Sequence, residues 1–277
     1  MTRPAWLVGV ALAGAVPAGA QGVMIAPHAV FIDHRQRSGA VTLFNPGTEP
    51  VEISVEVFFG YTTVDSLGNL TLVTLEHPDS SQPSAAGWIQ AFPRRVTVGS
   101  QERQTVRLLA TPPPELPDGE YWARLAFTAK AGQVPVTGVP DTAQIKIGLD
   151  LQVRSIIGLW YRKGAARTGV SVSSLQAERQ GDTVLVRASL RREGNAAFLG
   201  TAHLALANAR GRAVSEVRLP VGVFSGYEAR WSLPVATLAS GTYQLRLVLL
   251  TERDDFDNQR VILKAAPVRD SVQVVVP

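Results

Sequence analysis

The alternation of apolar and polar side chains along short segments constrains this chain more than any other feature. Residues 51–57 read VEISVEV, with an apolar residue at every odd position. A period of two is typical of a β-strand with one buried and one solvated face. Similar segments recur along the chain, and turn sequences such as Asn45-Pro46-Gly47 separate them. Because no segment beyond the first 20 residues has a convincing helical period, the pattern predicts an all-β protein.

The spacing of these segments, near ten residues, predicts sandwiches of two antiparallel sheets. An internal repeat indicates that there are two: residues 116–125 and residues 238–247 share the pattern L-x-x-G-x-Y-x-x-R-L. A tyrosine soon after a turn glycine resembles the tyrosine corner of immunoglobulin-type sandwiches. A length of 277 residues also suits about two domains. We therefore expect two immunoglobulin-like β-sandwich domains, residues 21–162 and 163–277, joined at a short stretch of small residues.

The first 20 residues have the order of features that marks a secretory signal peptide. Arg3 supplies a positive charge, residues 5–16 form an apolar run, and Ala18-Gly19-Ala20 gives the small-x-small pattern before a cut at Gln21. This run is too short to span a bilayer, and no later run reaches the roughly 18 residues that a membrane helix needs. The absence of cysteine suits an oxidising compartment. We expect a periplasmic protein without an integral membrane segment after signal removal.

Composition and motifs argue against several classes of function. The 27 Lys and Arg against 23 Asp and Glu give a net charge of only +4, without a basic stripe, so nucleic-acid binding is not expected. With no cysteine there is no disulfide, thiolate zinc site or cysteine nucleophile. The four histidines form no metal-binding motif, and phosphate-binding, dinucleotide-binding and GxSxG signatures are absent. We expect no cofactor, no metal site, no catalytic residue and no enzymatic activity.

The clearest alternation in the chain lies in residues 144–153. Its large apolar side chains occupy every odd position, namely Ile145, Ile147, Leu149, Leu151 and Val153. In an extended strand these side chains share one face, at intervals of about 6.6–6.8 Å. Two interpretations are open. The strand packs this face into its own domain, or it offers the face to an incomplete sheet of another protein, bound by main-chain hydrogen bonds and alternate side chains.

Ordered pieces of residues 23–162 resemble the first domain of periplasmic pilus-assembly chaperones. The matching pieces are residues 23–31, 38–45 with 49–50, 93–108, and 149–153 with 159–162. The resemblance implies donor-strand complementation, in which the chaperone lends its own strand to a pilus subunit that lacks one. Such chaperones then deliver the subunit to an outer-membrane usher. By position, Leu149, Leu151 and Val153 match the alternating donor residues of this family.

The chain departs from the family in the cleft between the domains. The family typically binds the subunit's terminal carboxylate there with an Arg on the first strand and a Lys on the donor strand. His28 and Gly158 stand at those positions, and glycine has no side chain to bind a carboxylate. Other basic residues, Arg154, Arg35 or Arg162, are candidates to replace the pair. We expect His28, Arg154 and Trp160 to lie in this cleft.

These observations predict a periplasmic chaperone-like protein that binds pilus or surface-fibre subunits through residues 145–153, with an outer-membrane usher as a further partner. The alternative is a non-enzymatic structural or adhesive envelope protein, in which immunoglobulin-like sandwiches act as rigid spacers. The missing basic pair favours this alternative. An envelope enzyme acting on carbohydrate would need carboxylates that converge in a cleft, which the sequence alone does not show.

Overall fold

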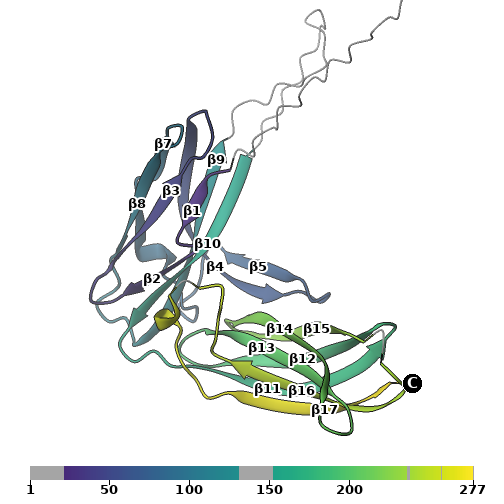
Figure 1. The fold of residues 1–277 in the computed structure, drawn as a ribbon. Helices are drawn as coiled ribbons and strands as arrows, with labels where there is room; N and C mark the ends of the chain where they lie inside the picture. The colour runs from purple at the N-terminus through teal and green to yellow at the C-terminus, as the bar shows by residue number, and fades with distance from the viewer. Residues whose placement is uncertain (1–21, 131–151, 236–237, 257, 277) are drawn as a thin grey trace, which may run out of the picture.

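The computed structural model describes residues 22–130, 152–235, 238–256 and 258–276. These residues form seventeen β-strands and two short 3-10 helices, η1 (Ala86–Trp88) and η2 (Gln259–Val261). The strands build two sandwiches that follow one another along the chain (Figure 1). The expected all-β architecture of two immunoglobulin-like domains is confirmed.

The first sandwich contains ten strands. They are β1 (Met24–Ala26), β2 (Ala29–Asp33), β3 (Ser38–Phe44), β4 (Val51–Val64), β5 (Leu70–Leu75), β6 (Ile89–Phe92), β7 (Arg95–Val98), β8 (Arg103–Ala110), β9 (Gly119–Lys130) and β10 (Gln152–Lys163). One sheet has the order β1-β3-β8-β6, and the other has the order β2-β10-β9-β4-β5, with β7 paired to β4. Alternate residues of both sheets meet in one core, which includes Val41, Leu108 and Leu125.

The second sandwich contains the remaining seven strands. They are β11 (Thr168–Gln180), β12 (Thr183–Gly194), β13 (Phe198–Ala207), β14 (Ala213–Val223), β15 (Gly226–Pro234), β16 (Gly241–Leu250) and β17 (Val268–Val276). Its sheets have the orders β11-β12-β15 and β14-β13-β16-β17. Val186, Leu204 and Leu247 lie in its separate core. Within the described residues no strand pairing joins β1–β10 to β11–β17, which supports the domain limits 21–162 and 163–277 that we propose.

The internal repeat forms the same corner in both sandwiches. In each copy the tyrosine hydroxyl donates to the carbonyl oxygen four residues upstream, Tyr121 to Pro117 at 2.9 Å and Tyr243 to Ala239 at 2.9 Å. The glycine of each copy begins a strand with a positive φ, 154° and 155° respectively. Residues with a Cβ rarely adopt such angles, so glycine is required at both turns. The repeated sequence therefore encodes a repeated structural element.

Candidate functional site

The first half of β10 is paired on one side only. The strand pairs with β9 along its whole length, whereas its parallel pairing with β2 begins at Gly158. Residues 152–157 therefore present an unpaired main-chain edge within the described residues, on the part of β10 that extends past β2 (Figure 1). An unpaired strand edge is a template for the addition of a further strand.

One of the five predicted donor residues, Val153, lies in the described part of the chain. The other four lie outside the described residues: Ile145, Ile147, Leu149 and Leu151. Val153 pairs with Ala129 of β9 and its side chain is 36% exposed. Further along β10, the odd positions Ile157 and Leu159 are buried in the core of the first sandwich. The odd-numbered side chains of β10 are thus buried in the protein's own core at residues 157 and 159, whereas Val153 is accessible to solvent.

A groove of about 480 Å³ runs beside this free edge, between β1 and β10. Its walls include Met24 and Ile25 of β1 and Ile156 and Ile157 of β10. The Ile156 side chain is 39% exposed, and Met24 is also exposed. An apolar groove next to an unpaired main-chain edge offers both features that an added strand uses, namely backbone partners and pockets for alternate side chains.

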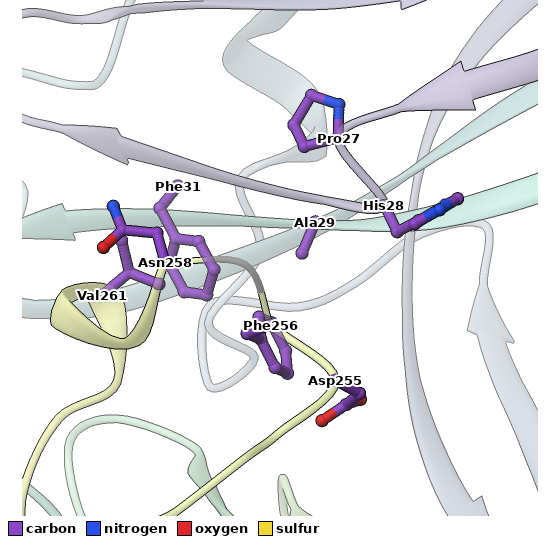
Figure 2. A pocket seen from close by; sticks show the side chains of 8 residues that line it. All are labelled: Pro27, His28, Ala29, Phe31, Asp255, Phe256, Asn258 and Val261. Atoms are coloured by element: carbon purple, nitrogen blue, oxygen red, sulfur yellow. The ribbon is translucent and has the colours of Figure 1, made fainter.

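His28 lies where this groove meets the space between the two sandwiches. It lines the groove and also two cavities of about 220 Å³ and 270 Å³ at the domain junction. Figure 2 shows the smaller cavity, which is lined by His28, Ala29 and Phe31 of the first sandwich and by Asp255 and Phe256 of the second; in this view the His28 ring points away from Asp255. The three spaces therefore share His28 in their walls.

Gly158 lies in the wall of the larger cavity, opposite Arg124 of β9 in the ladder. A Cβ built on Gly158 would lie 2.8 Å from Nη1 of Arg124 and would overlap the indole ring of Trp160. Any side chain at position 158 would therefore require the Trp160 ring and the Arg124 guanidinium to shift. Glycine here leaves room for the guanidinium group of Arg124.

Arg124 is a buried cation with no ion-pair partner among the described residues. The residue is only 7% exposed, and its Nε donates to the carbonyl oxygen of Gly60 at 3.1 Å. The guanidinium carbon lies 5.8 Å from the ring centroid of Trp160 and 5.5 Å from that of Phe224. Burial lowers the pKa of Arg124 to about 10, because loss of water disfavours the charged form. The group is still charged at neutral pH and would stabilise an anion in the cavity.

Trp160 lies at the domain junction, where it is buried. Its ring stacks on Phe31 with centroids 4.8 Å apart. It lines the same cavity as Arg124, and its indole Nε1 is buried without a hydrogen-bond partner among the described residues. A buried N–H donor without an acceptor is costly. The cavity wall therefore contains a cation without an ion-pair partner and an N–H group without an acceptor, among the described residues.

The other basic residues that the sequence indicated have different surroundings. Arg154 is half-exposed and its Nη2 lies 2.9 Å from a carboxylate oxygen of Glu56. The Nε of Arg162 lies 2.7 Å from the buried carboxylate of Glu120. Arg35 is exposed on the turn after β2. None of the three lines the cavity that Gly158 and Arg124 share.

Sequence reasoning missed Arg124, although a signal was present. Residues 121–127 read YWARLAF, so the arginine is the only charged residue in a strongly apolar segment. Charged residues are almost never fully buried unless they have a partner. An isolated arginine in such a strand therefore indicates either a buried ion pair or a site for an anion.

The junction between the sandwiches is held by the fully buried carboxylate of Glu120. Its Oε2 accepts from Nε of Arg162 at 2.7 Å, and its Oε1 accepts from the indole N–H of Trp122 at 2.9 Å. Oε1 also accepts from the backbone N–H of Ala197 at 3.0 Å, across the domain boundary. Around it lies an aromatic cluster drawn from both sandwiches, including Phe59 and Trp122. These contacts connect the two sandwiches beside the cleft.

Within the described residues, no three His, Cys, Asp or Glu side chains gather closely enough to hold a metal ion. Over the same residues, no helix combines the length and hydrophobicity needed to cross a membrane.

No protein-family model matches the chain, and no curated protein matches its sequence. Solved structures do match it. The YadV chaperone is 14% identical, with 91% of this chain and 98% of that chain covered and a TM-score of 0.45. A chain of the CsuC–CsuE chaperone–tip adhesion subunit pre-assembly complex of Acinetobacter baumannii Csu pili is 17% identical, with 91% and 98% covered and a TM-score of 0.45. A chain of the Salmonella enterica complex of SafA pilin with the SafB chaperone is 12% identical, with 91% and 96% covered and a TM-score of 0.42. Each of these structures contains a chaperone.

Proposed function

We propose that this protein is a periplasmic chaperone that holds pilus or surface-fibre subunits by strand donation from residues 145–153. The observation that carries the proposal is the unpaired edge of residues 152–157, which lies beside an apolar groove. The sequence resemblance over residues 23–162 supports the same function. Delivery of the subunit to an outer-membrane usher belongs to this proposal.

Strand donation would combine the burial of donor side chains with main-chain hydrogen bonds. Burying a Val, Leu or Ile side chain contributes about 1.5–3 kcal/mol, so five donor residues contribute roughly 7–15 kcal/mol. Loss of translational and rotational freedom on association costs an estimated 4–15 kcal/mol, about the same amount. Main-chain hydrogen bonds, worth about 0.5–1.5 kcal/mol each, must therefore supply much of the surplus. The free edge of β10 is where such bonds would form.

Within this proposal, Arg124 receives the subunit's terminal carboxylate in the cleft. Its guanidinium lines the cavity that also contains His28, and it has no acidic partner among the described residues. Arginine can bind a carboxylate through two parallel hydrogen bonds. The nearby unpartnered N–H of Trp160 is a further donor in the same wall. These contacts would replace the basic pair that His28 and Gly158 cannot form.

The second candidate function is that of a rigid structural or adhesive envelope protein. The buried Glu120 contacts favour it, because they connect the two sandwiches as a spacer requires. In that case the odd face of residues 145–153 would stay within the protein's own sheet. The two functions differ in whether a second protein needs that face.

The decisive experiment is periplasmic co-expression with a pilin-like subunit that lacks its final strand. The test variant carries Leu149→Lys and Leu151→Lys, and the matched control carries Asp150→Lys and Gln152→Lys on the opposite face of the same strand. We expect the test variant to lose the subunit from the soluble and co-purified fractions, and the control to retain it. Equal subunit recovery with both variants would contradict strand donation. Thermal unfolding of each purified variant verifies that the sandwiches remain folded.

A further inference from the structure

One face of the first sandwich combines exposed apolar side chains with arginine. It is the outward face of the sheet β1-β3-β8-β6, whose alternate residues, such as Val41 and Leu108, point into the core. We name this surface the arginine face and define it by six residues: Met24, Phe44, Phe92, Arg103, Arg107 and Leu109. Three of them, Met24, Phe92 and Leu109, are 61%, 52% and 45% exposed.

The strand register places these six residues on one face of the sheet. Met24 pairs with Phe44, and Phe44 pairs with Arg103, so these three form one row across three strands. A second row, four residues further along β8, contains Arg107 opposite Phe92. Each row thus presents an aromatic ring beside a guanidinium group. In the first row the guanidinium of Arg103 lies over the ring of Phe44, 5.1 Å from its centroid.

The charge of this face is of one sign. The strands β1, β3, β6 and β8 contain no Asp or Glu. Neither Arg103 nor Arg107 takes part in an ion pair among the described residues. Exposed arginines normally find carboxylates on their own surface or remain solvated. Here both lie beside exposed apolar groups, which water solvates poorly.

We propose that the arginine face is a docking surface for a partner protein whose own surface combines Asp or Glu with apolar side chains. Arginine, phenylalanine and methionine are the residue types enriched at protein interfaces, where lysine is depleted, and this face has no lysine. An anionic membrane is the weaker candidate. Each basic residue near such a membrane contributes about 1 kcal/mol, and membrane-binding clusters have 4–8 of them.

The size of the face sets the strength of the complex. The width of the face is that of four strands spaced about 4.8 Å apart, and its length is that of some seven residues at about 3.3 Å each. These dimensions give an area of roughly 300 Å². Stable complexes bury about 800 Å² on each partner. The proposed contact is therefore transient. It overlaps the groove beside β10, because Met24, Phe44 and Arg103 also line that groove, whereas Phe92, Arg107 and Leu109 lie outside it.

The test measures binding of a fluorescein-labelled dodecapeptide of alternating Glu and Leu by fluorescence anisotropy. We expect saturable binding at low salt that weakens as salt is raised. Arg103→Glu with Arg107→Glu should lower the affinity by at least about tenfold. The matched control is Arg191→Glu with Arg269→Glu, which replaces two exposed arginines of the second sandwich. It changes the net charge of the protein by the same amount as the test variant. It should lower the affinity less than about threefold. Phe92→Ala with Leu109→Ala should also weaken binding, and at high salt as well.

Three results would overturn the proposal. The first is no saturable binding of the Glu–Leu peptide at millimolar concentration. The second is an equal loss of affinity in the arginine-face variant and the control variant, since the effect would then reflect net charge alone. The third is tighter binding to vesicles containing anionic phosphatidylglycerol than to the peptide, with the same dependence on Arg103 and Arg107. Circular dichroism and thermal unfolding of each variant verify that a loss of binding is not a loss of fold.

Discussion

At the scale of single residues, the guanidinium of Arg124 lies close to Gly158, its partner in the ladder. The guanidinium occupies space that any Cβ at position 158 would enter. Removing a cation from water costs several kcal/mol when no counter-charge compensates it. Arg124 recovers part of this cost through one hydrogen bond to Gly60 and two aromatic faces. The chain therefore keeps a charge that the isolated fold does not need for its stability.

Arg124→Met tests this interpretation with two effects of opposite sign. We expect the free energy of unfolding to rise by about 1 kcal/mol, because the desolvation cost disappears and exceeds the value of one hydrogen bond. Subunit binding should weaken by at least about tenfold, because the carboxylate loses a charged partner. Urea unfolding and co-purification measure the two effects. The control Arg187→Met removes a partly exposed arginine that pairs with Glu178, and should change both by little. Lower stability with unchanged binding would contradict this role for Arg124.

Sequence analysis reached some of these residues and missed others for a physical reason. Position 158 was found because it aligns with a family position, and His28 was found in the same way. Arg124 was missed because periodicity places a residue on a strand face but does not say which cavity that face adjoins. The cavity is built from β2, β9, β10 and the loop after β16, which are far apart in sequence.

At the scale of the element, β10 has one paired edge at residues 152–157 and two paired edges from Gly158 onward. The alternation of residues 144–153 correctly indicated a strand at Gln152 and Val153, while the rest of that segment lies outside the described residues. The sequence could not show which main-chain edge of β10 lacks a partner strand. The parallel partner β2 is more than a hundred residues away and pairs only from Gly158 onward. The free edge is therefore a property of register, which local patterning does not encode.

The repeated tyrosine corner gives a prediction at the same scale. Tyr121→Phe and Tyr243→Phe each remove one hydroxyl that donates to a carbonyl oxygen at 2.9 Å. We expect each to lower the free energy of unfolding by about 0.5–1.5 kcal/mol. The double variant should show the sum, because the two corners lie in separate cores. Chemical denaturation measures all three. Destabilisation by only one substitution would mean that the repeat does not have the same structural role in both sandwiches.

At the scale of the whole molecule, the buried Glu120 makes the orientation of the sandwiches part of the fold. One carboxylate accepts hydrogen bonds from Arg162, Trp122 and Ala197, the last across the boundary. The tyrosine corners and the two large cores each lie within one sandwich. The hydrogen bond from Ala197 to Glu120 instead joins the two sandwiches. A subunit that extends from the free edge of β10 into the cleft needs this orientation to be fixed. Loss of the carboxylate should therefore affect both unfolding and binding.

Glu120→Gln tests that coupling. The amide keeps the shape but leaves Arg162 without a counter-charge, so the free energy of unfolding should fall by about 3–5 kcal/mol. We expect the single cooperative transition in urea to separate into two, and small-angle X-ray scattering to show a broader range of interdomain distances. The control Glu193→Gln changes an exposed carboxylate and should leave both unchanged. The double variant Glu120→Gln with Arg162→Gln removes both charges and should recover part of the lost stability, because no uncompensated charge remains buried. If Glu120→Gln instead unfolds in one transition at the original midpoint, the sandwiches are coupled by the aromatic cluster and not by this carboxylate.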